Sequence, residues 1–415
     1  MNLLEDLQYR GLQYQITEGL ESRLQASQPL TVYAGFDPTA DSLTIGNLVT
    51  VLLLRRFQLV GHVPIALVGG GTGLIGDPGG KSEERALNPE ETVAEWADKI
   101  RSQLEPYLDF SPSPNSAQIV NNYDWLGSIT AIDLMRDVGK HFPVPYMLAK
   151  DSVASRLETG ISYTEFSYMV LQAYDFLKLN EIYDCEAQIG GSDQWGNITA
   201  GVDLIRRTSS RKAYGLTCPL VTKADGGKFG KTEGGTVWLD AARTSPYEFY
   251  QFWINVDDAS ALRYLRIFTF LDRDEIDALE KITADDPGKR EAQRRLALET
   301  TSLTHGAATA QKAERISTAL FYGKLETLEE DEIELGFHDV PTHTIGDKEH
   351  ELLDLLVEAK ISPSKRQARE DVSNGAIYIN GVRCPEPNRL IRTRDGLHRK
   401  YLVIRRGKNK YFLIR

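Results

Sequence analysis

The sequence has few cysteines and no long apolar run. Only Cys185, Cys218 and Cys384 occur among 415 residues, far apart and without a Cys-x-x-Cys or Cys/His cluster. This sparse, odd set excludes a disulfide framework and a structural zinc site, and it indicates a reducing compartment with buried thiols. The longest apolar runs, such as residues 63–68, are too short to cross a bilayer, and the first residues lack the features of a signal peptide. We therefore expect a cytoplasmic protein without membrane contact.

The charge is unevenly distributed along the chain. The net charge of −11 argues against a general nucleic-acid binder, and we expect no binding to DNA. Residues 351–415, however, contain 15 Lys and Arg against 7 Asp and Glu, a net charge of +8, which leaves −19 for the first 350 residues. A basic end on an acidic body indicates a segment that binds a polyanion, and the alternative is a chance fluctuation on a solvated face.

Strand-like and helix-like segments alternate over the first half of the chain. Short apolar runs bounded by Gly, Asp, Asn or Pro predict strands at 31–36, 63–70, 118–122 and 186–191. Apolar residues at helical spacing predict helices at 43–61, 89–108 and 164–179. This alternation predicts a doubly wound parallel sheet, a Rossmann-like α/β domain, over residues 1–220. Ligands of such sheets lie at the carboxyl ends of the strands.

The second half of the chain has a different pattern. Residues 221–323 begin with a Gly- and Lys-rich loop and are then helical throughout, which predicts an all-α domain. Residues 325–349 carry nine acids and one lysine without clear periodicity, so we expect a linker over 324–349. Residues 350–415 have two helical segments and then a pair of strands, which predicts a small α+β module.

One helical segment carries a polar stripe on an apolar surface. Ser162 and Glu165 have the spacing of a capping box, so the helix should begin there. Tyr168, Gln172 and Asp175 then lie on one face, at i, i+4 and i+7. This face could simply be exposed to solvent, as in any amphipathic helix. The alternative is that it points into a binding site.

Two other segments favour a binding site. Tyr33 stands at the end of the strand 31–36, before the turn at 36–39, and the polar segment 190–197 follows the strand 186–191 and begins the next helix. Both segments place polar groups where a doubly wound sheet binds its ligand. A pocket with a phenol hydroxyl, a carboxylate and amides suits a small zwitterion that has a hydroxyl of its own.

Two glycine-rich motifs do not fit the functions they first suggest. Residues 71–76 match Gly-x-Gly-x-x-Gly, but Pro78 and further glycines follow where a dinucleotide-binding motif would begin a helix. Residues 77–82 nearly match the phosphate-binding Gly-x-x-x-x-Gly-Lys-Ser, but Ile75 occupies the position of its first glycine. A dehydrogenase and a phosphate-loop NTPase are therefore disfavoured.

Five segments resemble the bacterial tyrosyl-tRNA synthetases. They are residues 33–43, 67–78, 160–176, 188–198 and the Lys-Phe-Gly-Lys-Thr sequence at 228–232, in the family's order. The resemblance implies a class I synthetase that uses L-tyrosine, ATP with Mg²⁺, and tRNA(Tyr), and that has no metal site of its own. It also implies a helical anticodon-side domain, an RNA-binding C-terminal module and a homodimer whose interface includes residues 135–142.

The resemblance assigns roles to individual residues. Those expected to bind tyrosine are Tyr33 and Asp175 at the phenol, Tyr168, Gln172 and Asp77 at the ammonium group, and Gln194. Those expected to bind the ATP moiety are Asp37, Gly46, Gly191, Asp193 and Lys231. Those expected to act in catalysis, by stabilising the phosphates, are Lys81, Arg85, Lys228, Lys231, Thr232, Thr39, Thr44 and Asn47. No protein nucleophile is needed, because the carboxylate of tyrosine attacks the α-phosphate directly.

The chain departs from the family at one signature. Class I synthetases usually carry His-x-Gly-His where this sequence has Thr44-Ile45-Gly46-Asn47. Asn47 and Thr44 can still donate hydrogen bonds, and the reaction needs donors rather than a general base, so we predict retained activity. The alternative is a synthetase-like RNA-binding protein with reduced or lost aminoacylation. Activation of tryptophan is a further rival, disfavoured because Tyr33 and Asp175 suit a phenol.

Overall fold

The computed structural model describes residues 2–77, 87–154, 156–157, 160–223, 226–227, 229–232, 235–338, 340–346, 348–407 and 410–415. The chain forms two compact units, Met1–Thr244 with Val256–Leu296, and Ser245–Asn255 with Ala297–Arg415. The boundaries expected at residues 220 and 323 do not coincide with this division, because the helical residues 256–296 group with the sheet whereas residues 245–255 group with the second unit.

A six-stranded sheet forms the centre of the first unit. Its order is β1-β6-β5-β2-β3-β4, and only β1 runs antiparallel to its neighbour. The strands are β1 (Gln15–Ile16), β2 (Thr31–Phe36), β3 (Val63–Val68), β4 (Gln118–Asn121), β5 (Cys185–Gly191) and β6 (Tyr214–Cys218). The chain goes from β2 outward through β3 and β4, then returns to add β5 and β6 on the other side. The strand order therefore reverses between β2 and β5, where doubly wound sheets bind their ligands.

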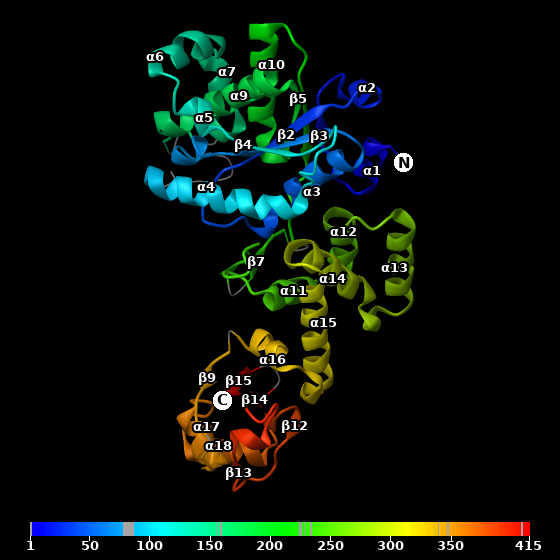
Figure 1. Ribbon diagram of the computed structural model, residues 1–415, viewed down its shortest axis with the longest axis vertical. Helices are drawn as coiled ribbons and strands as arrows, with labels where there is room; N and C mark the ends of the chain where they lie inside the picture. Colours follow the sequence, from blue (N-terminus) through cyan, green and yellow to red (C-terminus); the bar gives the residue numbers. More distant parts are fainter. Residues whose placement is uncertain are drawn as a thin grey trace. The chain divides into compact units, whose positions relative to one another are not determined.

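Helices cover both faces of this sheet, as predicted. Figure 1 shows α9 (Tyr163–Tyr183) and α10 (Trp195–Ser209) on one side, and α3 (Ile45–Leu59) and α4 (Glu90–Leu104) on the other. The predicted start of α9 is confirmed, because the Ser162 side chain accepts a hydrogen bond from the Glu165 amide. Shorter helices complete the sheet region: α1 (Leu3–Tyr9), α2 (Leu20–Leu24), α5 (Tyr123–Leu126), α6 (Ala131–Asp133), α7 (Val144–Leu148) and α8 (Asp151–Ala154).

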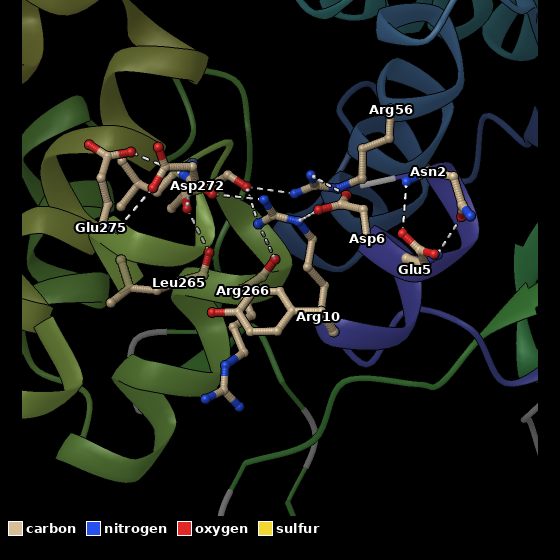
Figure 2. Close-up of polar contacts among 12 residues, drawn as sticks. Asn2, Glu5, Asp6, Arg10, Arg56, Leu265, Arg266, Asp272 and Glu275 are labelled. Carbon is tan, nitrogen blue, oxygen red and sulfur yellow. Dashed lines mark hydrogen bonds and ion pairs between the residues drawn. The ribbon is translucent and has the colours of Figure 1, made fainter. Parts of the chain in front are cut away.

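Two buried arginines join α12 (Asp258–Phe268) to the sheet region (Figure 2). Arg10 donates to the carbonyls of Thr269 and Leu271, at 3.2 and 2.7 Å, and Arg56 of α3 donates to the Thr269 carbonyl at 2.5 Å. Asp6 forms ion pairs with both arginines. Burial, and then repulsion from Arg10, lowers the pKa of Arg56 to about 9. Because these donors bind main-chain carbonyls, the loop after α12 is held in place whatever its side chains are. The helix α13 (Arg273–Asp285) follows this loop.

The second unit contains helices and the basic C-terminal module. Its helices are α11 (Pro246–Ile254), the end of α14 (Glu291–His305), α15 (Ala307–Tyr322), α16 (Glu330–Gly336), α17 (Leu352–Glu358) and α18 (Lys365–Ser373). Its five-stranded sheet has the order β12-β11-β14-β15-β9. These strands are β9 (Thr342–His343), β11 (Ile377–Ile379), β12 (Val382–Arg383), β14 (Leu402–Arg406) and β15 (Lys410–Ile414), and β10 (His350–Glu351) pairs separately with β13 (Leu390–Ile391).

The expectation of a linker at 324–349 is wrong for much of that segment. It contains α16, and β9, which pairs in parallel with β15. Ile333 and Phe337 of α16 are buried in a core with Ile316 of α15 and Val403 of β14. The acidic composition concealed these apolar residues, and their burial holds the segment against the C-terminal module.

Two further expectations can be compared with the structure. All three cysteines are buried, as predicted. Within the described ranges, no helix combines the length and the apolar character needed to cross a bilayer.

Candidate active site

A cleft of about 330 Å³ opens at the carboxyl end of the sheet, where the strand order reverses. The predicted site residues that line it are Tyr33, Asp37, Thr39, Gly46, Asn47, Asp77, Tyr168, Gln172, Asp175, Gly191, Asp193 and Gln194. Residues from both halves of the sheet thus meet in one cavity. The polar face of α9 points into this cleft rather than into bulk solvent, with Tyr168 5% and Asp175 2% exposed.

The deepest polar groups are the Tyr33 hydroxyl and the Asp175 carboxyl. Tyr33 lies in the middle of β2 and not at its end, so the sequence-based placement was wrong by three residues. Its side chain is 1% exposed, its ring packs 5.1 Å from that of Phe176, and its hydroxyl has no hydrogen-bond partner among the described residues. Burial, and then the nearby Asp175, raises the pKa of Tyr33 well above its ordinary value. The hydroxyl therefore stays protonated and can still donate or accept a bond.

Two residues that the sequence did not single out hold the Asp175 carboxyl. Asn122 Nδ2 donates to its Oδ2 at 2.9 Å, and Trp125 Nε1 donates to its Oδ1 at 2.7 Å. Burial raises the pKa of Asp175 to about 8, although both hydrogen bonds act to lower it. The available signal was the position of Asn122 directly after β4, at the same edge of the sheet.

Asp37 is the centre of a second group of hydrogen bonds. The Tyr168 hydroxyl donates to Asp37 Oδ2 at 2.6 Å, and the Thr72 hydroxyl donates to Asp37 Oδ1 at 2.7 Å. Asn122 Nδ2 donates in turn to Thr72 Oγ1 at 2.9 Å. A Cβ atom at position 69 would lie 2.0 Å from Asp37 Oδ1, so only glycine allows this carboxylate to approach β3 so closely. Asp37 and Asp175 are thus connected through the hydrogen bonds of Thr72 and Asn122.

Side-chain amides line the opposite wall. Gln194 Nε2 donates to Asp77 Oδ2 at 2.7 Å and to Asp193 Oδ2 at 3.1 Å. Gln172 Nε2 donates to Gln194 Oε1 at 3.1 Å, and Asn197 Nδ2 donates to Gln172 Oε1 at 2.9 Å. This chain of bonds fixes the direction of each amide beside the carboxylates of Asp77 and Asp193, which line the cleft. Such a wall suits an ammonium group.

The charge of the described lining is negative. It includes four aspartates, Asp37, Asp77, Asp175 and Asp193, and neither lysine nor arginine. Lys231 is exposed on β7 (Lys231–Thr232), which pairs with β8 (Gly235–Thr236), and it is not among the lining residues. For Thr232 the structure describes only the backbone. Lys81, Arg85 and Lys228 lie outside the described residues.

The N-terminus of α3 forms the remaining rim. Asn47 Oδ1 accepts bonds from the Thr44 amide at 2.9 Å and from the Thr44 hydroxyl at 2.8 Å. This arrangement turns the Asn47 Nδ2 donor away from Thr44. Gly46, Asn47 and the unpredicted Thr50 line the cleft, whereas Thr44 supports Asn47 and is not itself in the lining. The two residues that replace the family's histidines therefore act as one cap with one donor to the cleft.

The fold and the cleft together define a doubly wound α/β protein with a polar cleft at its switch point. Comparison with known proteins narrows this class. The family described as tRNA synthetases class I (W and Y) matches residues 25–322, and the Tyrosine--tRNA ligase SYY-like C-terminal domain matches residues 332–414. The chain therefore belongs to the class I tRNA synthetases of the tryptophan and tyrosine type.

Similar proteins cover the whole chain. Tyrosine--tRNA ligase 1 of Bacillus subtilis is 57% identical over 100% of this chain and 99% of its own length. Tyrosine--tRNA ligase of Bacillus caldotenax is 59% identical over 100% of both chains.

Solved structures support the same fold. A C-terminally truncated mitochondrial tyrosyl-tRNA synthetase of Aspergillus nidulans superposes with a TM-score of 0.71 at 29% identity, over 77% of this chain and 94% of its own. A tryptophanyl-tRNA synthetase of Encephalitozoon cuniculi, at 12% identity and a TM-score of 0.54 over 75% of this chain and 87% of its own, shares the fold alone.

Proposed function

We propose that this protein is a cytoplasmic tyrosine–tRNA ligase. It activates L-tyrosine with ATP, releasing pyrophosphate, and then transfers the tyrosyl group to the 3′ end of tRNA(Tyr). The observation that carries the proposal is 57–59% identity to tyrosine–tRNA ligases over the full length of the chain. The inward-facing polar groups of α9 support the same substrate.

The phenol of the substrate binds between Tyr33 and Asp175. Its hydroxyl donates to the Asp175 carboxylate and accepts from the buried Tyr33 hydroxyl, which has no partner among the described residues. Phenylalanine would leave the Tyr33 hydroxyl desolvated and unpaired, which costs about 1–3 kcal/mol, and would leave Asp175 with only its bonds from Asn122 and Trp125. Tryptophan would place an N–H donor, without an acceptor, opposite Tyr33.

The ammonium and nucleotide ends follow from the remaining groups. Asp77, Tyr168 and Gln172 hold the ammonium group, because all three line the cleft and each carries an oxygen that can accept a hydrogen bond. Nearer the rim, the ATP moiety is bound by Asp37, Gly46, Gly191, Asp193 and Gln194. The carboxylate of tyrosine then faces the nucleotide, and the aspartates of the cleft neutralise the ammonium group of tyrosine.

The chemical step requires positive charge that the described lining does not supply. As the tyrosine carboxylate forms its bond to the α-phosphorus, the bond to the pyrophosphate oxygen breaks and negative charge grows on the leaving group. Lys81, Arg85, Lys228, Lys231 and Thr232 are proposed to stabilise this charge, with Thr39 and Asn47 as neutral donors. Mg²⁺ enters with ATP, as part of the substrate. Among the described residues no group of His, Cys, Asp and Glu could hold a metal ion, so the phosphates would supply its ligands.

A homodimer is proposed for the sheet unit. Ile132, Met135, Val144 and Leu148 are 70%, 57%, 58% and 38% exposed, and all lie within α6, the adjoining π-helical turn and α7. Exposed apolar residues grouped in this way are typical of a subunit interface. The segment includes residues 135–142, which resemble the family's interface region. Light scattering of the purified protein should give twice the mass of a single chain.

Exchange of labelled pyrophosphate into ATP tests the proposed activity. The exchange should depend on tyrosine and not on phenylalanine or tryptophan. Tyr33→Phe should lower kcat/KM for tyrosine about 2- to 12-fold, since one neutral hydrogen bond is worth about 0.5–1.5 kcal/mol. Tyr174→Phe is the matched control, because Tyr174 lies on the same helix but does not line the cleft. Binding of tRNA without any tyrosine-dependent exchange would instead support the RNA-binding alternative.

A further inference from the structure

The sheet unit has a second cavity, which is basic where the cleft is acidic. Its volume is about 190 Å³, and its lining comes from the end of α1 with the turn after it, from the segment after β6, and from α12. Three of the lining residues are the arginines Arg10, Arg263 and Arg266, and none is acidic. The lining of the cleft has four aspartates and neither lysine nor arginine. The two cavities therefore favour ligands of opposite charge.

Arg10 supplies a fixed positive charge on one side of this cavity. Its Nε donates to Asp6 at 2.7 Å, and its terminal nitrogens donate to three main-chain carbonyls, including that of Arg266 at 3.0 Å. Figure 2 shows Arg10 held in this way close to Arg266. Because most of its donors are already used, Arg10 contributes to the electrostatic potential of the cavity more than to direct hydrogen bonding.

Arg263 and Arg266 lie one turn apart on α12 and keep donors for a ligand. Arg263 is exposed and forms no ion pair within the described part of the chain, and the hydrogen bond from its Nη1 to the Thr222 carbonyl is long, at 3.4 Å. Arg266 pairs with Glu280 through Nη2, but its buried Nε has no hydrogen-bond partner among the described residues. A guanidinium with unused N–H groups is the side chain best suited to bind an oxyanion.

We propose that this cavity, the α12 pocket, binds a small phosphate anion. Near neutral pH a phosphate group carries close to two negative charges and offers three acceptor oxygens, which suits arginines that come from both α1 and α12. A carboxylate has a single charge and only two oxygens. The volume lies below the roughly 300–1,000 Å³ of pockets for larger ligands, so a nucleotide is too large. Two sources fit: inorganic phosphate, and the pyrophosphate that the proposed reaction releases. Only the second source rests on the proposed function.

The α12 pocket borders the start of the segment that leads to the Lys-Phe-Gly-Lys-Thr sequence. Val221 lines the pocket, and the carbonyl of the next residue, Thr222, accepts hydrogen bonds from Arg263 and, at 3.2 Å, from the Tyr264 hydroxyl. Hydrogen bonds between two charged groups are shorter and stronger than a bond to a neutral carbonyl. A bound phosphate therefore takes Arg263 from Thr222 and leaves this carbonyl to Tyr264 alone.

Calorimetric titration of the full-length protein with inorganic phosphate, and separately with pyrophosphate, tests the α12 pocket. Arg263→Ala should weaken the binding of both anions at least about 10-fold, as the loss of a charged hydrogen bond requires. Gln8→Glu adds a negative charge to the lining without changing its size, and it should weaken binding about 5-fold, whereas Gln8→Lys should strengthen it by a similar factor. Gln8 and Arg263 are both exposed, so these variants should fold normally. The matched control is Arg101→Ala, which removes an exposed arginine of α4 outside the lining.

Lys231→Ala distinguishes the α12 pocket from the cleft. Lys231 is proposed to bind the leaving pyrophosphate and does not line the α12 pocket, so the part of the binding that depends on Arg263 should persist in this variant. Tighter binding of pyrophosphate than of phosphate would identify the reaction product as the ligand, and equal affinities would identify inorganic phosphate. The proposal is overturned if the unmodified protein binds neither anion, or if Arg263→Ala and Gln8→Glu leave the binding unchanged. Tyrosine-dependent pyrophosphate exchange tests the proposed function separately, because its absence would leave the phosphate titration unaffected.

Discussion

Trp125→Phe tests whether the ionised form of Asp175 binds tyrosine. In the structure the indole Nε1 lies 2.7 Å from Asp175 Oδ1, and the two side chains are 7% and 2% exposed. Phenylalanine keeps most of the buried apolar volume but removes the donor. The carboxylate then keeps only the Asn122 bond, while burial continues to raise its pKa.

The expected effect follows from the pKa of Asp175, which is about 8. A hydrogen bond to a charged group contributes about 1.5–3 kcal/mol, so its loss should raise this pKa by about 1–2 units. At pH 7.5 the ionised fraction would fall from about one quarter to about 3% or less, which raises the KM for tyrosine roughly 8- to 80-fold. At pH 9.5 Asp175 would be almost fully ionised in the unmodified protein and partly ionised in Trp125→Phe. The ratio of the two KM values for tyrosine should therefore fall below about 5.

Pyrophosphate exchange between pH 6.5 and 9.5 gives both KM values. The KM for ATP should be similar in the two proteins, because Trp125 does not line the cleft. Trp96→Phe makes the same substitution on α4, away from the cleft, and should leave both constants unchanged. If the ratio of tyrosine KM values in Trp125→Phe stays near one, or does not shrink as the pH rises, the assignment of Asp175 as the carboxylate acceptor is wrong.

Three further predictions concern stability and the altered signature. The raised pKa of Asp175 means that the folded protein holds this proton more tightly than the unfolded chain, so the free energy of unfolding should fall as the pH rises from about 4 to 8; Asp175→Asn should flatten this dependence in thermal unfolding. The unmodified protein should form tyrosyl-adenylate in a single turnover. Thr44→His/Asn47→His should change the rate by no more than about tenfold, since the pair offers one donor to the cleft and one such bond contributes only about 0.5–1.5 kcal/mol; absence of adenylate from the unmodified protein would contradict this. Arg56→Met should lower the free energy of unfolding of the sheet unit by about 1.5–3 kcal/mol, because it removes one of the two charged donors to the Thr269 carbonyl, and an unchanged melting temperature would refute it.

The doubly wound sheet could be predicted from the sequence because its signals are local. Each predicted strand between residues 31 and 191 ends at, or is directly followed by, Gly, Asp or Asn, and the capping residue Ser162 marks the start of α9. The polar stripe on α9 was informative for the same reason, since helical spacing alone puts its members on one face.

The rest depended on contacts between distant segments. Asn122 and Trp125 were missed because they reach Asp175 only after the end of β4 packs beside α9, about 50 residues further along the chain. Tyr33 was wrongly placed at the end of its strand. The pattern of a strand shows which residues share a face, but it does not show how far a cleft extends along the strand. The segment at 324–349 was misinterpreted because its acids outnumber the few apolar residues that tertiary packing buries.

Helix α3 connects the cleft to the loop after α12, two parts of the enzyme that lie far apart in the sequence. Its first turn carries Gly46 and Asn47, which line the cleft, and Arg56 near its other end donates a hydrogen bond to the loop after α12. The rise of an α-helix puts these points about 14 Å apart, so a tilt of about 5° at the arginine end moves the Asn47 donor by about 1 Å. A displacement of that size is enough to impair the alignment of reacting groups. We therefore expect substitutions in α12 or in the loop after it to alter adenylate formation without contacting a substrate, because this loop holds the Arg56 end of α3.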